Sequence, residues 1–124
     1  MQEKTKSEQG NELLQGMPGV RLTSVQFVLS YLILGFDEKG ALTTLVWPEV
    51  TDAAGRTYRF GKEGYRDTLC GLIEEVVSDV SISTEEVIKI SFKNGSLLRI
   101  PLREHTLPGE RAIFTAPKHQ LFVW

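Results

Sequence analysis

The chain has 124 residues, a length that fits one domain built around one core. Hydrophobic residues make up 41% and charged residues 24%, which is typical of a soluble globular protein and excludes the fibrous and disordered classes. The net charge of −2 comes from 14 basic and 16 acidic residues spread along the chain, so no basic surface for nucleic acid or an anionic membrane is indicated.

The N-terminal segment and the single cysteine favour a cytoplasmic protein. Residues 1–11 are polar and charged, unlike a secretory signal, and we expect a mobile tail there, before a single domain at 12–124. No later stretch reaches the roughly 18 apolar residues of a membrane span. Cys70 has no second cysteine with which to form an internal disulfide, which is usual in a reducing compartment.

The segment 22–47 predicts three antiparallel strands. A turn at 37–40 separates the second strand from a third strand at 42–47, which Pro48 ends. The first two strands are expected to be buried on one face, because their apolar residues are spaced to lie together: Leu22, Val25, Phe27, Leu32, Leu34 and Phe36.

The next segment predicts a hairpin and a helix. Residues 50–60 alternate around a reversal at 52–55, which favours a short hairpin. The next apolar residues fall at spacings of four, three and four, as on one face of an amphipathic helix of about three turns: Tyr65, Leu69, Leu72 and Val76. Cys70 lies within this helix and is expected to be a buried or half-buried side chain.

Residues 76–102 repeat the pattern of residues 21–47. The Asn-Gly pair at 94–95 is a strong signal for a tight hairpin turn, and aligning the two turns puts Leu97 in the place of Leu42. Two interpretations stay open. The chain is either an internal duplication, whose copies pack about a pseudo-twofold axis, or merely self-similar, as any protein with two tight hairpins is.

The C-terminal residues 112–124 predict a closing hairpin with Pro117 in its turn. The fold predicted from all these elements is α+β and mostly antiparallel. Its two similar meanders form a sandwich or a half-open barrel, with one packed helix and the C-terminal hairpin. Unpaired edge strands of such a fold are natural sites for a homodimer or a partner protein.

The order of these elements supports a family resemblance over residues 22–124. An alternating strand ending in Phe, a glycine turn and a short helix are followed by the same strand pattern in VIKISFKNGSLLRIP. This order resembles a family of small uncharacterised bacterial domains of unknown function built from two similar β-meanders. The resemblance implies a bacterial cytoplasmic protein, an interaction or immunity-type module, and no defined catalytic residues. The loop at 103–110, REHTLPGE, departs from the family pattern.

Residues with the spacing needed for catalysis or metal binding are few. Gly61 and Gly64 precede the helix without the GKS or GKT of a phosphate-binding loop. His105 and His119 lie in predicted loops and lack a cysteine or another histidine at metal-ligand spacing. We therefore expect no cofactor and no metal. The sequence favours a protein that is not an enzyme, but it does not decide between the two.

Two functional interpretations follow. The favoured one is a non-enzymatic protein-interaction module, of an immunity or regulatory kind, that uses a sheet edge or four aromatic side chains: Trp47, Tyr58, Phe122 and Trp124. The alternative is a small-ligand-binding or enzymatic β domain with a pocket formed by Glu104, His105 and His119. A flat apolar surface supports the first interpretation, and a cavity where those three side chains meet supports the second.

Overall fold

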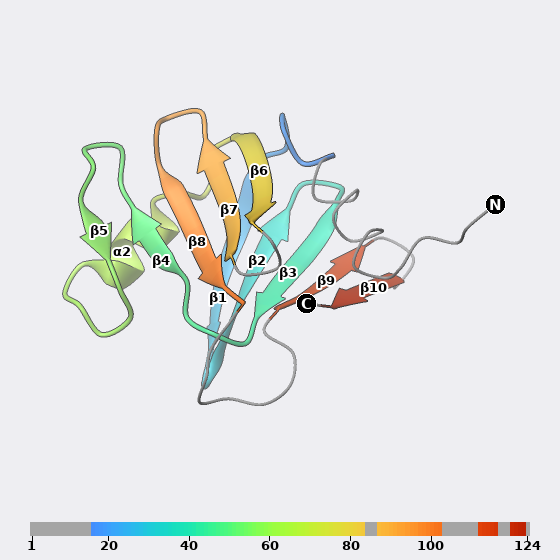
Figure 1. Ribbon diagram of the computed structural model, residues 1–124, viewed down its shortest axis with the longest axis horizontal. Coiled ribbons are helices and arrows are strands. Elements are labelled where there is room, and N and C mark those ends of the chain that lie inside the picture. The colour runs from blue at the N-terminus through green and yellow to red at the C-terminus, as the bar shows by residue number, and fades with distance from the viewer. Residues whose placement is uncertain (1–15, 84–86, 103–111, 117–119, 124) are drawn as a thin grey trace.

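The computed structural model shows two antiparallel β-sheets and, among the residues that it describes, one short helix (Figure 1). It describes residues 16–83, 87–102, 112–116 and 120–123, so the predicted tail at 1–11 lies outside the described residues. The prediction that the chain is mostly antiparallel β-structure is confirmed. Within the described ranges, no helix has the length and apolar character required to cross a lipid bilayer.

Each sheet has five strands, and every pairing within it is antiparallel. The first sheet contains, in spatial order, β1 (Leu22–Val28), β2 (Tyr31–Phe36), β3 (Gly40–Thr44), β9 (Ala112–Ala116) and β10 (Gln120–Val123). The second contains β5 (Thr57–Tyr58), β4 (Glu49–Thr51), β8 (Leu97–Pro101), β7 (Val87–Phe92) and β6 (Val77–Ser83). The helix α2 (Tyr65–Cys70) lies between β5 and β6 in the chain.

The two sheets exchange hairpins. The β4–β5 hairpin follows β3 in the chain but pairs with β8, in the second sheet. The β9–β10 hairpin follows β8 but pairs with β3, in the first sheet. Each sheet is therefore a meander from one half of the chain that is extended by a hairpin from the other half.

Matching β-bulges explain the three-residue spacing of apolar residues in β1 and β6. In β1 the register shifts between Leu22 and Ser24, and in β6 it shifts between Val77 and Asp79. An extra residue at such a bulge returns the following apolar side chains to the core face. At the β1 bulge a Cβ atom on Gly35 would lie 2.3 Å from the Ser24 hydroxyl oxygen, so a larger residue in β2 would force the Ser24 side chain to move.

The two halves of the chain meet through reciprocal backbone contacts. Arg21 and Val76 form an isolated antiparallel bridge. The Leu22 amide donates to the Glu75 carbonyl at 3.0 Å, and the Val77 amide donates to the Val20 carbonyl at 2.8 Å. In each bond the donor and the acceptor are shifted by 55 residues relative to the other bond, so the two bonds are equivalent. Reciprocity of this kind is the pattern of an approximate twofold axis. A common origin of the two halves stays a prediction.

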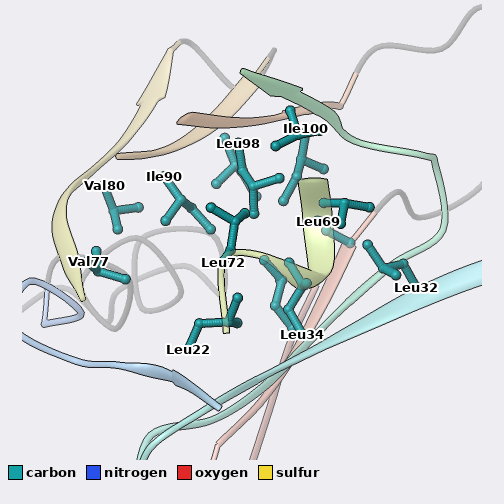
Figure 2. Close-up of a cluster of buried hydrophobic side chains, with 14 of the residues drawn as sticks. Leu22, Leu32, Leu34, Leu69, Leu72, Val77, Val80, Ile90, Leu98 and Ile100 are labelled. Carbon is teal, nitrogen blue, oxygen red and sulfur yellow. The ribbon is translucent and has the colours of Figure 1, made fainter. Parts of the chain in front are cut away.

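The core lies between the sheets and includes α2. Figure 2 shows buried side chains of the two sheets pointing toward one another, with Leu69 and Leu72 between them. Both leucines expose 2% or less of their surface. Full burial of such a side chain stabilises the fold by about 1.5–3 kcal/mol, so α2 and the turn after it are part of the core that joins the sheets.

The structure corrects the predicted extent of the helix. The helix has six residues rather than about three turns. From Leu69 onward the hydrogen bonds tighten, with the Leu72 amide donating to the Leu69 carbonyl at 3.0 Å, and Glu74 then takes a left-handed conformation with φ 79°. Val76, the last residue predicted for the helical face, therefore lies in the bridge to Arg21.

Two strand predictions are also corrected. Of the β1 residues predicted to be buried, only Leu22 is, because β1 lies at an edge of its sheet, where Val25 and Phe27 are only partly covered. The third strand ends at Thr44 rather than at residue 47. The residue of β8 that corresponds to Leu42 is Leu98, not Leu97 as predicted. Leu42 lies opposite Leu34 in the first sheet, and Leu98 lies opposite Ile90, the counterpart of Leu34, in the second.

Candidate interaction surface

Four aromatic side chains form a continuous set of ring contacts, here called the aromatic row: Phe27, Trp47, Phe60 and Tyr65. The Trp47 ring stacks on both phenylalanines, with centroid distances of 6.3 Å to Phe27 and 4.2 Å to Phe60 and interplanar angles of 24° and 11°. Phe60 meets Tyr65 edge to face at 6.1 Å. Each such pair contributes about 0.5–1.5 kcal/mol beyond its buried area, so the row is a preorganised platform.

The aromatic row is open to solvent at two of its rings. Phe27 exposes 36% of its surface and Phe60 exposes 48%, and Leu29, in the turn after β1, is fully exposed. Single exposed apolar side chains are common, whereas contiguous ones mark interaction sites. The Arg66 guanidinium carbon lies 5.8 Å from the Phe27 ring centroid, a cation–π geometry that adds a positive charge at this end of the row.

The connection between β3 and β4 holds Trp47 in place. The Thr44 hydroxyl donates to the Val46 carbonyl, and the Tyr65 hydroxyl donates to the Pro48 carbonyl. The residues before and after Trp47 in the sequence, Val46 and Pro48, are buried. The Trp47 indole between them is half-buried, so part of it stays accessible to solvent. Burial raises the pKa of Tyr65, which keeps its hydroxyl protonated as a hydrogen-bond donor.

A glycine turn after β5 holds Phe60. The Lys62 amide donates to the Arg59 carbonyl at 3.0 Å, and Gly61 has φ 93°, a conformation in which glycine bears little steric cost. The Lys62 ammonium lies 4.8 Å from the Tyr58 ring centroid and donates to a β5 carbonyl at 3.0 Å. The turn is thus fixed by its own polar contacts, although the Phe60 side chain remains half exposed.

A second set of side chains crosses the outer face of the second sheet, here called the charged row: Arg59, Glu49, Arg99 and Lys89. Glu49 lies opposite Arg99, and Arg99 lies opposite Lys89, in the strand register. The Arg59 guanidinium donates to the Glu49 carboxylate at 2.8 Å. The residues that alternate with this row on β4, β7 and β8 are buried, so the row lies on the face away from the core.

An open hollow of about 400 Å³ joins the two rows. Trp47 belongs to the aromatic row and lines this hollow together with three members of the charged row, Glu49, Arg59 and Arg99, and with Val87 and Pro101. A second hollow, of about 500 Å³, is lined by residues 60–67, beside Phe60. The surface therefore combines exposed aromatic rings, guanidinium groups and shallow concavities.

The predicted site residues are distributed as follows. Trp47 and Tyr58 are both half-buried and pack against the core. Trp47 also lies in the aromatic row, whereas Tyr58 faces Gly64, where an added Cβ would lie 3.2 Å from its ring. Phe122 lies opposite Phe114 in the β9–β10 hairpin, and its side chain is outside the description. Four further residues lie outside the described ranges: Glu104, His105, His119 and Trp124.

The exposed rings Phe27 and Phe60 were not among the predicted site residues. Both occupy apolar positions of alternating segments, which is also the pattern of core residues. The available signal was the position of Phe60 next to Gly61, where a strand ends and the chain turns. The edge position of β1, which exposes Phe27, depends on strand order and has no local sequence signal.

Cys70 is exposed, contrary to the prediction that it is buried or half-buried. It follows Leu69 on a short helix, and a rotation of about 100° per residue turns its thiol away from the core that Leu69 enters. Within the described part of the chain, no three His, Cys, Asp or Glu side chains are grouped as a metal site would require.

No protein-family model, curated protein or solved structure matches the chain. The resemblance to small bacterial two-meander domains therefore stays a prediction, and the function has to be argued from the aromatic row and the charged row themselves.

Proposed function

We propose that the protein is a protein-interaction module that binds its partner through the aromatic row and the adjoining charged row. The observation that carries the proposal is the stack in which Trp47 joins two exposed rings, Phe27 and Phe60. Aromatic and arginine side chains dominate the binding energy of protein interfaces, especially where they are already fixed before binding. Here the stacking fixes the rings, and Arg59, Arg66 and Arg99 surround them.

The test combines site-specific crosslinking with reconstitution. Phe60→p-benzoylphenylalanine places a photocrosslinker on the aromatic row, and the same change at Lys93, an exposed residue beyond β7, provides the control position. We expect a protein that is crosslinked from position 60 and not from position 93. That protein is then identified, purified and titrated against the unmodified chain, because capture alone does not establish a specific partner.

The decisive measurement is the Kd of the reconstituted complex. Phe27→Ser combined with Phe60→Ser should weaken binding by more than about tenfold, because aromatic hot spots commonly contribute 2 kcal/mol or more each. Ile73→Ser is the matched control, since Ile73 is 37% exposed and belongs to neither row. Equal affinity of the double variant and the Ile73→Ser variant would refute the proposal, provided that circular dichroism shows both to be folded.

A further inference from the structure

The charged row contains an unbalanced pair of cations. Arg99 and Lys89 lie directly opposite one another on β8 and β7, and like charges in such cross-strand positions destabilise a sheet. The one carboxylate in the row, that of Glu49, is bound by Arg59 at 2.8 Å. Among the described residues, no carboxylate lies within ion-pair distance of Arg99 or Lys89. The sheet thus presents two neighbouring cations without a described counter-ion.

The sign of this row is opposite to that of the chain. Three cations and one carboxylate give the row a charge of +2, whereas the whole chain carries −2. The hollow beside Phe60 has no net charge, because its lining includes two basic residues, Lys62 and Arg66, and two acidic ones, Glu63 and Asp67. The positive excess is therefore local to the charged row and to the hollow beside Trp47.

We infer that the partner is a protein segment that places carboxylate side chains on Arg99 and Lys89 and an apolar side chain on the aromatic row. This inference rests on the proposed function and adds the chemistry of the partner. The hollow of about 400 Å³ is lined by an indole and by two arginines, which suits an apolar side chain next to an acidic one. Guanidinium groups bind carboxylates through paired hydrogen bonds.

The charge pattern favours an acidic protein over a nucleic acid. Nucleic-acid surfaces carry many cations that follow a regular phosphate backbone, whereas this row has one pair of cations, Arg99 and Lys89, that makes no ion pair with the described residues. Glu49 repels any anion beside it, but a phosphate backbone carries a charge at every nucleotide, whereas a peptide can place an uncharged residue next to Glu49. An acidic segment of alternating carboxylate and apolar residues therefore makes fewer like-charge contacts with the charged row than a nucleic acid does.

The test is a selection of displayed random peptides of about 12 residues on the full chain. Selected peptides are synthesised, and their Kd values are measured for the unmodified chain, for Phe60→Ser, and for Lys89→Ala combined with Arg99→Ala. Lys93→Ala is the matched control, because it removes one exposed cation outside the row. We expect peptides rich in Asp and Glu with an aromatic or aliphatic residue, and binding at least about tenfold weaker to both row variants.

The outcomes separate this inference from the proposed function. Peptides that lose affinity for Phe60→Ser but bind the Lys89→Ala, Arg99→Ala variant normally would uphold the aromatic row and overturn the acidic partner. The absence of any peptide sensitive to Phe60→Ser would overturn both. A dT12 oligonucleotide that binds more tightly than the acidic peptides, or a dimer of the chain that Phe60→Ser dissociates in light scattering, would also overturn the inference.

Discussion

Glu74 offers a direct test of how the backbone joins the two halves. It has φ 79°, in the left-handed region, where a residue with a Cβ atom bears a cost of about 1–2 kcal/mol. The corresponding position 55 residues earlier is Gly19, with φ 90°. The amides of both residues donate across the halves, Glu74 to the Leu22 carbonyl at 2.7 Å and Gly19 to the Val77 carbonyl at 2.8 Å.

We expect Glu74→Gly to stabilise the protein. Glycine removes the left-handed cost and keeps the amide donor, but it adds about 0.5–1 kcal/mol of unfolded-state entropy, so the net gain is about 0.5–1 kcal/mol. At about 2.1 cal/mol/K per residue, unfolding 124 residues has an entropy of about 0.26 kcal/mol/K. The expected rise in Tm is therefore about 2–4 °C, which differential scanning calorimetry resolves.

Two controls isolate the backbone conformation. Glu74→Ala removes the carboxylate but keeps the Cβ atom, so its Tm should stay close to that of the unmodified chain. Gly19→Ala should lose about 0.5–1 kcal/mol, because the left-handed cost exceeds the unfolded-state entropy that alanine removes, although a Cβ atom there would meet nothing within 4 Å. A lower Tm for Glu74→Gly, or an unchanged Tm for Gly19→Ala, would refute the reasoning.

Three further predictions concern the contacts that support the fold and the surface. Tyr65→Phe leaves the Pro48 carbonyl without its donor and should cost about 1–3 kcal/mol in urea unfolding, and a cost near zero would contradict this hydrogen bond. Leu69→Ala should cost about 2–5 kcal/mol in the same assay, because Leu69 is fully buried, and a loss under about 1 kcal/mol would contradict its place in the core. The Asp52 carboxylate accepts from the Arg56 backbone amide at 2.9 Å, which is the main reason that its pKa lies below the usual 3.8. Its stabilising contribution to the hairpin is therefore present above about pH 4 and lost as the pH falls through the folded pKa. Arg56→Ala should keep most of the lowering of the Asp52 pKa, because the backbone amide at position 56 remains. An NMR titration that gave Asp52 a pKa of 3.8 or higher in the unmodified chain would contradict the proposed role of this hydrogen bond.

Local sequence signals were sufficient to predict most strands and turns. Alternation located β2 and β7, whose buried residues are every second one, and the Asn-Gly pair at 94–95 located the turn between β7 and β8. The three-residue spacing in β1 and β6 was visible as a pattern, but its cause was not. A bulge restores the core face after an interrupted alternation, and only the strand register reveals it.

Strand order could not be predicted from the sequence, and the candidate surface depends on strand order. A turn signal says that β4 and β5 pair with each other, but not that β4 also pairs with β8, whose residues lie about 50 positions later. The same limit applies to Phe27 and Tyr58, which both occupy alternating apolar positions. Phe27 is exposed because β1 ends its sheet, whereas Tyr58 packs against the core and faces Gly64 at the start of α2.

The hairpin exchange also forms the surface that we propose as the binding site. Trp47, Glu49 and Arg59 come from the first half of the chain, whereas Val87, Arg99 and Pro101 come from the second, and they line one hollow only because β4 pairs with β8. If β4 and β5 instead extended the first sheet, Arg99 and Lys89 would lack both the neighbouring Glu49 and the indole. The β9–β10 hairpin makes the equivalent pairing with β3, so neither half forms its five-stranded sheet alone. The surface and the fold therefore depend on the same pairing, and a change that loosens β4 from β8 should weaken binding before it unfolds the first sheet.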